Sequence, residues 1–201
     1  MRSMLPILSS ALLLLLGACV PPQRPIDYYN LASLPGTGSD SEGTARLRVQ
    51  VREVSLPPYL DRSQIVLRVS PNRYKVSDSH IWLEQLPAAV ARVLAEDIGS
   101  RLGTMAVYTP SQVAPYELDY LVDIDIFRLD PVADGTVELD ARWHLFDGGN
   151  RIVDSRRQRL RLPVGGEGYE AYVAAMSSAL GRLADDIAGV IIARRKGDGG
   201  S

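Results

Sequence analysis

Hydrophobic and polar residues alternate in several stretches of this chain. In one of them, Leu47, Val49 and Val51 fall on one side and arginines fall on the other. A period of two is the repeat of a β-strand with one buried face. This pattern, together with shorter extended segments, predicts strands at about residues 26–31, 45–54, 65–69, 75–76, 105–108, 116–129, 136–146 and 151–162.

Two other stretches repeat their apolar residues every three or four positions, which is typical of a helix with one buried face. The first lies between residues 81 and 102. Pro87 fits only the first turn, where its missing N–H would have no partner in any case, so the helix begins shortly before it and ends at Gly103. The second runs from about Tyr169 to Arg195 and carries one continuous apolar stripe.

The order of these elements predicts an α+β fold, with a mostly antiparallel sheet and two long helices packed on one face. A glycine-containing hairpin at residues 147–150 joins the last two long strands. Counting across this hairpin predicts that Asp140 faces Arg157 and that Glu138 faces Arg159. Opposite charges in facing positions would fix the register of the two strands.

The N-terminal segment has the pattern of a secretory signal. It carries a basic residue, Arg2, and an apolar run over residues 5–16. This run is shorter than the roughly 20 apolar residues that a bilayer crossing needs. A retained transmembrane anchor and a signal peptide cut elsewhere are the alternatives. The end of the run resembles the lipobox of bacterial lipoproteins, formed by Leu16, Gly17, Ala18 and Cys19.

The lipobox resemblance implies that Cys19 is the lipid attachment site and becomes the mature N-terminus. Several acyl chains at that residue would hold the protein firmly on a membrane. The residue after the cysteine is Val20, whereas an aspartate there would favour retention in the inner membrane. The resemblance therefore implies that the protein is located in the outer membrane, with its domain facing the periplasm. The predicted organisation is a signal peptide over residues 1–18, a proline-rich tether over 19–26, a single domain over 27–196 and a disordered tail over 197–201.

Composition and charge exclude several classes of function. The formal net charge of −2 does not support nucleic-acid binding, which requires an excess of basic residues. Cys19 is the single cysteine, and acylation would consume it, so a disulfide and a thiolate nucleophile are excluded. His80 and His144 lack neighbours at metal-ligand spacing. The sequence therefore predicts no catalytic residue, no metal and no cofactor.

The strongest enzymatic alternative is a cluster of carboxylates on two neighbouring strands. Asp123 and Asp125 share one strand face, and the following turn would bring them near Glu138 and Asp140. A periplasmic hydrolase could use such a cluster to bind a metal or as an acid pair. A polar strand face exposed to solvent, neutralised by nearby arginines, explains the same residues without an activity.

Three stretches together resemble the ABC-type transport auxiliary lipoproteins, the family that contains paraquat-inducible protein C. They are residues 28–31 (Tyr-Tyr-Asn-Leu), residues 56–66 (Leu-Pro-Pro-Tyr-Leu-Asp-Arg-Ser-Gln-Ile-Val) and residues 82–86 (Trp-Leu-Glu-Gln-Leu). The resemblance covers nearly the whole mature chain.

This resemblance implies a non-enzymatic docking component of an envelope lipid-transport system of the mammalian-cell-entry (MCE) type. The implied partners are a periplasmic MCE protein and its ABC transporter, together with further copies of the chain, as in a ring. An assembly or chaperone lipoprotein for outer-membrane components is the alternative, and it would co-purify with barrel-assembly machinery.

The proline-shaped loop in the second stretch is the candidate contact surface for a partner. Its residues are Tyr59, Leu60, Asp61 and Arg62. The competing hypothesis is that Tyr59 and Leu60 fold back onto the sheet.

Overall fold

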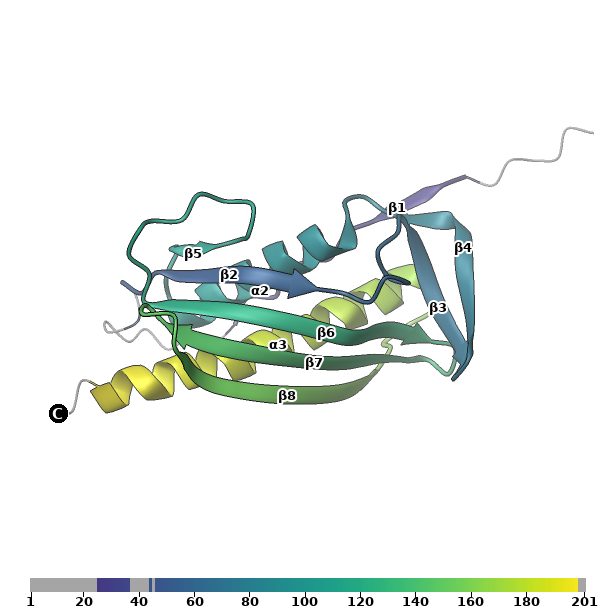
Figure 1. The fold of residues 1–201 in the computed structure, drawn as a ribbon. Helices are drawn as coiled ribbons and strands as arrows, with labels where there is room; N and C mark the ends of the chain where they lie inside the picture. The colour runs from purple at the N-terminus through teal and green to yellow at the C-terminus, as the bar shows by residue number, and fades with distance from the viewer. Residues whose placement is uncertain (1–24, 37–43, 45, 199–201) are drawn as a thin grey trace, which may run out of the picture.

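The structure is a computed structural model that describes residues 25–36, 44 and 46–198. In these ranges a mixed eight-stranded sheet is covered on one face by two helices (Figure 1). The strands are β1 (Asp27–Tyr29), β2 (Val49–Ser55), β3 (Gln64–Ser70), β4 (Arg73–Trp82), β5 (Val107–Tyr108), β6 (Tyr120–Val132), β7 (Thr136–Asp147) and β8 (Ile152–Pro163). The helices are α2 (Leu86–Leu102) and α3 (Gly168–Asp198).

The long strand β6 organises the sheet. On one side it pairs antiparallel with β7, and β7 pairs antiparallel with β8. On the other side its first half pairs in parallel with β2, and its end meets β3 where Val132 faces Arg68. From β3 the sheet continues to β4 and β1, while β5 lies beside β2.

The prediction of a mostly antiparallel sheet is wrong. Four of the seven strand pairings are parallel, namely β1–β4, β2–β5, β2–β6 and β3–β6. The alternation of apolar and polar residues has the same period whichever way the neighbouring strand runs, so the pattern carries no information on direction. The prediction followed the one visible hairpin, whereas the parallel pairs join strands that are distant in the sequence.

Both helices end and begin close to where the sequence predicts. Pro87 lies in the first turn of α2, and Gly103 ends that helix with a positive φ of 68°. The α3 helix extends through residues 197 and 198, the first two of the predicted tail. Its apolar stripe lies against the sheet and α2, with Met176, Leu180 and Leu183 almost fully buried. Burying each such side chain contributes about 1.5–3 kcal/mol, so the helix is held by this stripe.

A short segment after β1, residues 31–36, is fastened across both helices and is called the strap below. Asp97 of α2 accepts hydrogen bonds from the Ser33 hydroxyl and the Leu34 N–H, both at 2.7 Å. Arg101 donates to the Leu34 carbonyl at 3.1 Å and to the Gly181 carbonyl of α3 at 2.9 Å. Two buried side chains of one helix therefore join the strap to the second helix.

The register of the β7–β8 hairpin differs from the prediction by two residues. Phe146 faces Ile152, which shifts the pairing by one residue, and a bulge at Val153 adds another. As a result Asp140 faces Arg159, and Glu138 faces Arg161. An extra residue in one strand of an antiparallel pair is the usual origin of such a shift.

Candidate functional site

The predicted lipid attachment site lies outside the described residues. Cys19 and the lipobox residues Leu16, Gly17 and Ala18 all belong to residues 1–24, so their role stays a prediction. In the part of the chain that the structure describes, neither helix is long and apolar enough to cross a bilayer.

The predicted contact loop divides into an anchored half and an exposed half. Leu60 is 4% exposed and belongs to the core. The Tyr59 hydroxyl donates to Asp130 Oδ1 at 2.6 Å, and the Tyr59 ring lies 5.1 Å from the ring of Tyr74. Asp61 and Arg62 are exposed. Only the second half of the loop therefore presents side chains that a partner can reach.

The exposed half of the loop meets two other segments at the end of β4. The Trp82 N–H donates to the Ser63 carbonyl at 2.7 Å, and the Leu83 N–H donates to the Tyr29 carbonyl at 2.8 Å. A hollow of about 490 Å³ lies between the exposed half of the loop and the end of β4. We call it the motif hollow, and its lining residues are Asp61, Arg62, Ser63, Trp82, Leu83, Glu84 and Gln85.

Arg92 of α2 joins the segment after β1 to the segment after β4. It donates to Glu84 Oε1 at 2.7 Å, to the Asn30 side chain at 3.2 Å and to the Leu31 carbonyl at 3.1 Å. Bonds from a guanidinium to a carboxylate are among the stronger hydrogen bonds in proteins. The stretches that begin at Tyr28, Leu56 and Trp82 in the sequence therefore converge on one surface of the folded chain.

Two further hollows continue from the motif hollow along α2. The first, of about 550 Å³, shares Glu84 and Gln85 with the motif hollow. The second, of about 490 Å³, shares Arg92, Thr109 and Gln112 with the first. Because neighbouring hollows share lining residues, they form one row that follows α2 as far as Gly103.

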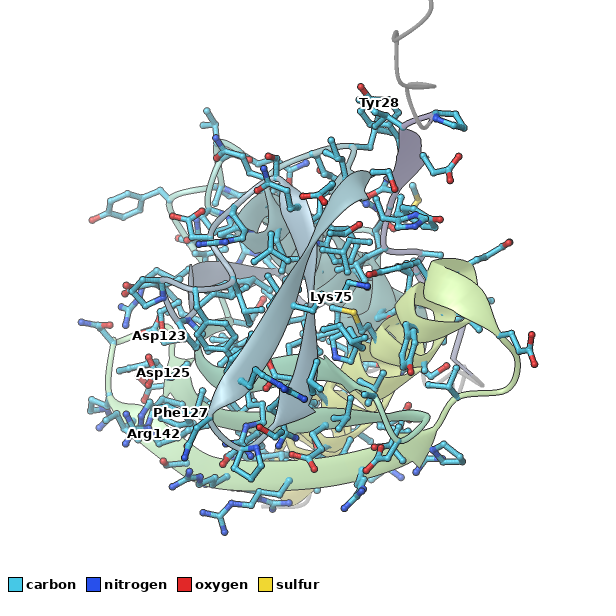
Figure 2. All side chains as sticks on the ribbon, turned by 90° about the vertical axis from the view of Figure 1, so that its right-hand side faces the viewer. Tyr28, Lys75, Asp123, Asp125, Phe127 and Arg142 are labelled. Atoms are coloured by element: carbon cyan, nitrogen blue, oxygen red, sulfur yellow. The ribbon has the colours of Figure 1, made fainter. Side chains whose placement is uncertain are left out.

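The candidate carboxylate cluster lies on the sheet face opposite the helices, where Asp123 and Asp125 project from β6 (Figure 2). The four carboxylates do not converge on a common site, because arginines stand between them. Asp125 pairs with Arg142 at 2.9 Å, and Asp140 pairs with Arg157 at 2.7 Å. Asp123 pairs with Arg52, and Glu138 pairs with Arg128 and Arg68.

The charges on this face favour a structural role for the carboxylates. The Arg142 guanidinium holds the pKa of Asp125 below its usual value, and Arg157 does the same to the pKa of Asp140. A general acid at neutral pH needs a pKa that is raised. Among the described residues, no group of three or more His, Cys, Asp or Glu side chains is arranged to hold a metal ion.

Sequence reasoning missed a buried charged cluster around Asp130, near the end of β6. The Asp130 side chain is 1% exposed, and Arg68 Nε lies 3.2 Å from its Oδ2. Burial raises the pKa of Asp130, although the hydrogen bond from Tyr59 and the charge of Arg68 act against this. Burial also raises the pKa of Tyr59. No sequence signal identified the cluster, because its members come from the contact loop, β3, β4 and β6.

Comparison with known proteins identifies the family. The model of the ABC-type transport auxiliary lipoprotein component matches residues 29–188. The chain belongs to this family, as the three stretches of residues predicted. As a member of this family, it is an auxiliary component of ABC-type transport and a lipoprotein of the cell envelope.

Solved structures show the same fold at low sequence identity. One, described as an uncharacterized protein, has a TM-score of 0.69 and 20% identity, over 84% of this chain and 99% of its own. Protein XCC0632 from Xanthomonas campestris has a TM-score of 0.69 and 17% identity, over 87% of this chain and 100% of its own. No curated protein matches the chain.

Proposed function

We propose that this protein is the non-enzymatic, outer-membrane end of an MCE-type ABC lipid-transport system. It is anchored through acyl chains on Cys19, faces the periplasm and docks a periplasmic MCE protein. Further copies of the chain assemble with it, as the family resemblance implies. The transport family supports the general role, and the lipobox residues support the anchor.

The convergence at the motif hollow is the observation that carries this proposal. Asp61, Arg62 and Gln85 are exposed at its rim, beside the exposed apolar side chain of Leu83. A rigid backbone frame holds these groups in place, because Trp82 and Leu83 are hydrogen-bonded to the segments on either side. Exposed charged and polar side chains of this kind are typical of the rim of a protein contact.

The arrangement of charges supports binding over catalysis. The carboxylates that might act as acids or bases are paired with arginines and spread along the outer face of the sheet. The motif hollow contains no histidine and no cysteine among its lining residues. Its side chains can recognise a partner by charge and shape.

The test is a pull-down of the MCE partner with the acylated, full-length protein in detergent. Arg62→Glu reverses an exposed charge at the motif hollow, and we expect it to abolish capture of the partner without lowering the melting temperature. Arg73→Glu is the matched control, because Arg73 is exposed at the opposite end of β4. Tyr59 is left intact, since it binds Asp130 and its loss would disturb the fold.

Equal capture by both variants would remove the motif hollow as the docking surface. Capture of barrel-assembly machinery in place of an MCE protein would favour the assembly-lipoprotein alternative. Mass spectrometry of the purified protein tests the anchor separately, because it reports whether acyl chains are attached at Cys19.

A further inference from the structure

β1 carries an apolar surface that the fold leaves uncovered. Ile26, Tyr28 and Leu83 are 49%, 62% and 66% exposed. Tyr28 pairs with Ile81 across the β1–β4 ladder, and the Leu83 N–H is bonded to Tyr29. These four side chains, Ile26, Tyr28, Ile81 and Leu83, are called the β1 patch.

The opposite side of β1 is held in the molecule, which fixes the direction of the β1 patch. The Tyr29 hydroxyl lies 2.9 Å from His80 Nδ1, and the His80 ring stacks on Tyr169 of α3 with ring centres 3.9 Å apart. Successive side chains of a strand point to opposite faces. Tyr28 therefore projects outward, at the end of the molecule away from Asp123 and Asp125 (Figure 2).

The length of the preceding chain limits what can reach this surface. Cys19 lies seven residues before Ile26. An extended chain spans at most about 3.6 Å per residue, so an acylated Cys19 holds the β1 patch within about 25 Å of the bilayer. Among the surfaces described, the β1 patch is the one that directly follows the tether in the sequence.

The side chains match the chemistry of a lipid interface. Tyrosine is enriched where a protein meets the headgroup region, since its ring is apolar and its hydroxyl is polar. Lipid-anchored proteins also make contacts with the membrane through their own side chains. Acyl chains that already hold the domain at the surface raise the local concentration of this weak second contact.

We propose that the β1 patch rests on the lipid headgroup region of the membrane that holds the acyl chains. This inference depends on the proposed anchor at Cys19. The β1 patch and the motif hollow share Leu83, so a partner in the hollow would sit beside the membrane surface. A hydrophobic cargo released there would have a short path into the bilayer.

The test uses the acylated, full-length protein in vesicles of phosphatidylethanolamine and phosphatidylglycerol that contain nitroxide-labelled lipid. An environment-sensitive fluorophore is attached through Leu83→Cys, and in a control protein through Val113→Cys. Val113 is 96% exposed and lies in the loop after β5, toward the opposite end of the molecule (Figure 1). Acylation blocks the Cys19 thiol, so the introduced cysteine is the one that reacts.

Quenching at residue 83 should be about threefold stronger than at residue 113, with a blue-shifted emission only at residue 83. Adding Tyr28→Glu should lower it to the level of residue 113 without changing the melting temperature. Equal quenching at the two positions in vesicle-bound protein overturns the proposal. A blue shift that grows with protein density and ignores the nitroxide also overturns it, in favour of a contact between copies.

The anchor has its own readout in the same experiment. If the wild-type protein takes up the fluorophore and fails to float with the vesicles, Cys19 is unmodified, and the proposed anchor fails. If the protein floats and residue 83 is quenched no more than residue 113, the anchor stands and the lipid contact fails.

Discussion

Asp125 and Asp130 lie five residues apart on β6, on the same outer face of the sheet, yet their surroundings differ sharply. The Asp125 side chain is 36% exposed and pairs with Arg142. The Asp130 side chain is 1% exposed, because the β3–β4 hairpin and the contact loop bring Arg68, Tyr74 and Tyr59 over it. The pKa of Asp125 is lowered and that of Asp130 is raised.

The comparison shows that the segments covering a charged residue, and not its position on the strand, determine whether it is buried in this protein. A bulge at Phe127 keeps both aspartates on one face, so the strand itself does not distinguish them. The layer that covers the end of β6 makes the difference. The Asp130 carboxylate accepts a hydrogen bond from Tyr59 and so anchors the half of the contact loop that precedes the exposed Asp61 and Arg62.

The largest effect is expected from removing the buried carboxylate. Asp130→Ala leaves the buried Arg68 guanidinium with Glu138 as its remaining ion-pair partner among the residues described, and it removes the acceptor of the Tyr59 hydroxyl. Breaking a buried pair in this way should lower the free energy of unfolding by about 3–5 kcal/mol. Urea unfolding followed by the fluorescence of Trp82 and Trp143 measures the loss.

Asp125→Ala is the matched control for that measurement. It removes an ion pair on a solvent-exposed face, which should cost less than about 1 kcal/mol. Similar losses for the two variants would show that coverage by the β3–β4 hairpin is unimportant to the Asp130 cluster.

A smaller effect is expected from the anchor of the contact loop. Tyr59→Phe keeps the ring against Tyr74 but leaves Asp130 without its 2.6 Å hydrogen bond. The expected loss of stability is about 1–2 kcal/mol, and capture of the partner should weaken with it. Tyr74→Phe is the comparison, because the Tyr74 hydroxyl lies 3.4 Å from Asp130 and its residue is 38% exposed. A greater loss from Tyr74→Phe would contradict this ranking.

The smallest effect is a difference in pH dependence. The raised pKa of Asp130 means that the folded state binds a proton before the unfolded state does, so the protein gains stability over Asp130→Asn as the pH falls toward about 4. The lowered pKa of Asp125 gives the opposite sign, so the advantage over Asp125→Asn is lost as the pH falls below about 4.

Urea unfolding at several pH values, with each variant compared with the wild type, separates the two slopes. Burial also raises the pKa of Asp97, but this group is present in every protein compared, and its contribution cancels. Two slopes of the same sign would refute the contrast between the aspartates.

The sequence predicted both helices and most strands because their signals are local, although the short strand expected at residues 75–76 is the longer strand β4 (Arg73–Trp82). Pro87 and Gly103 mark the two ends of α2 through backbone chemistry that needs no distant partner. The strand pairings depend on distant partners, and the β7–β8 register failed because the bulge at Val153 has no signature in the alternation. The dependence on distant partners also explains why the parallel pairings of the mixed sheet were not predicted.

The residues around the motif hollow also come together through partners that are distant in the sequence. The three stretches of the family resemblance identified a family, and their meeting at Trp82 depends on the parallel pairing of β1 with β4, which the sequence does not show. Tyr59 and Leu60 looked as available as Asp61 and Arg62, since the acceptor that holds Tyr59 is 71 residues away. The fold separates the anchored residues from the exposed ones.

The strap gives the N-terminal side of the domain a mechanical role. A pull along the chain before β1 first loads a parallel ladder of three residue pairs, which must shear together. Force that is transmitted beyond this ladder reaches the hydrogen bonds of Asp97 and Arg101 to the strap. Because Arg101 also bonds to Gly181 of α3, both helices share this force. A force on the chain before β1 is thus spread into the packed interior and does not pass through the outer layer of arginines and carboxylates.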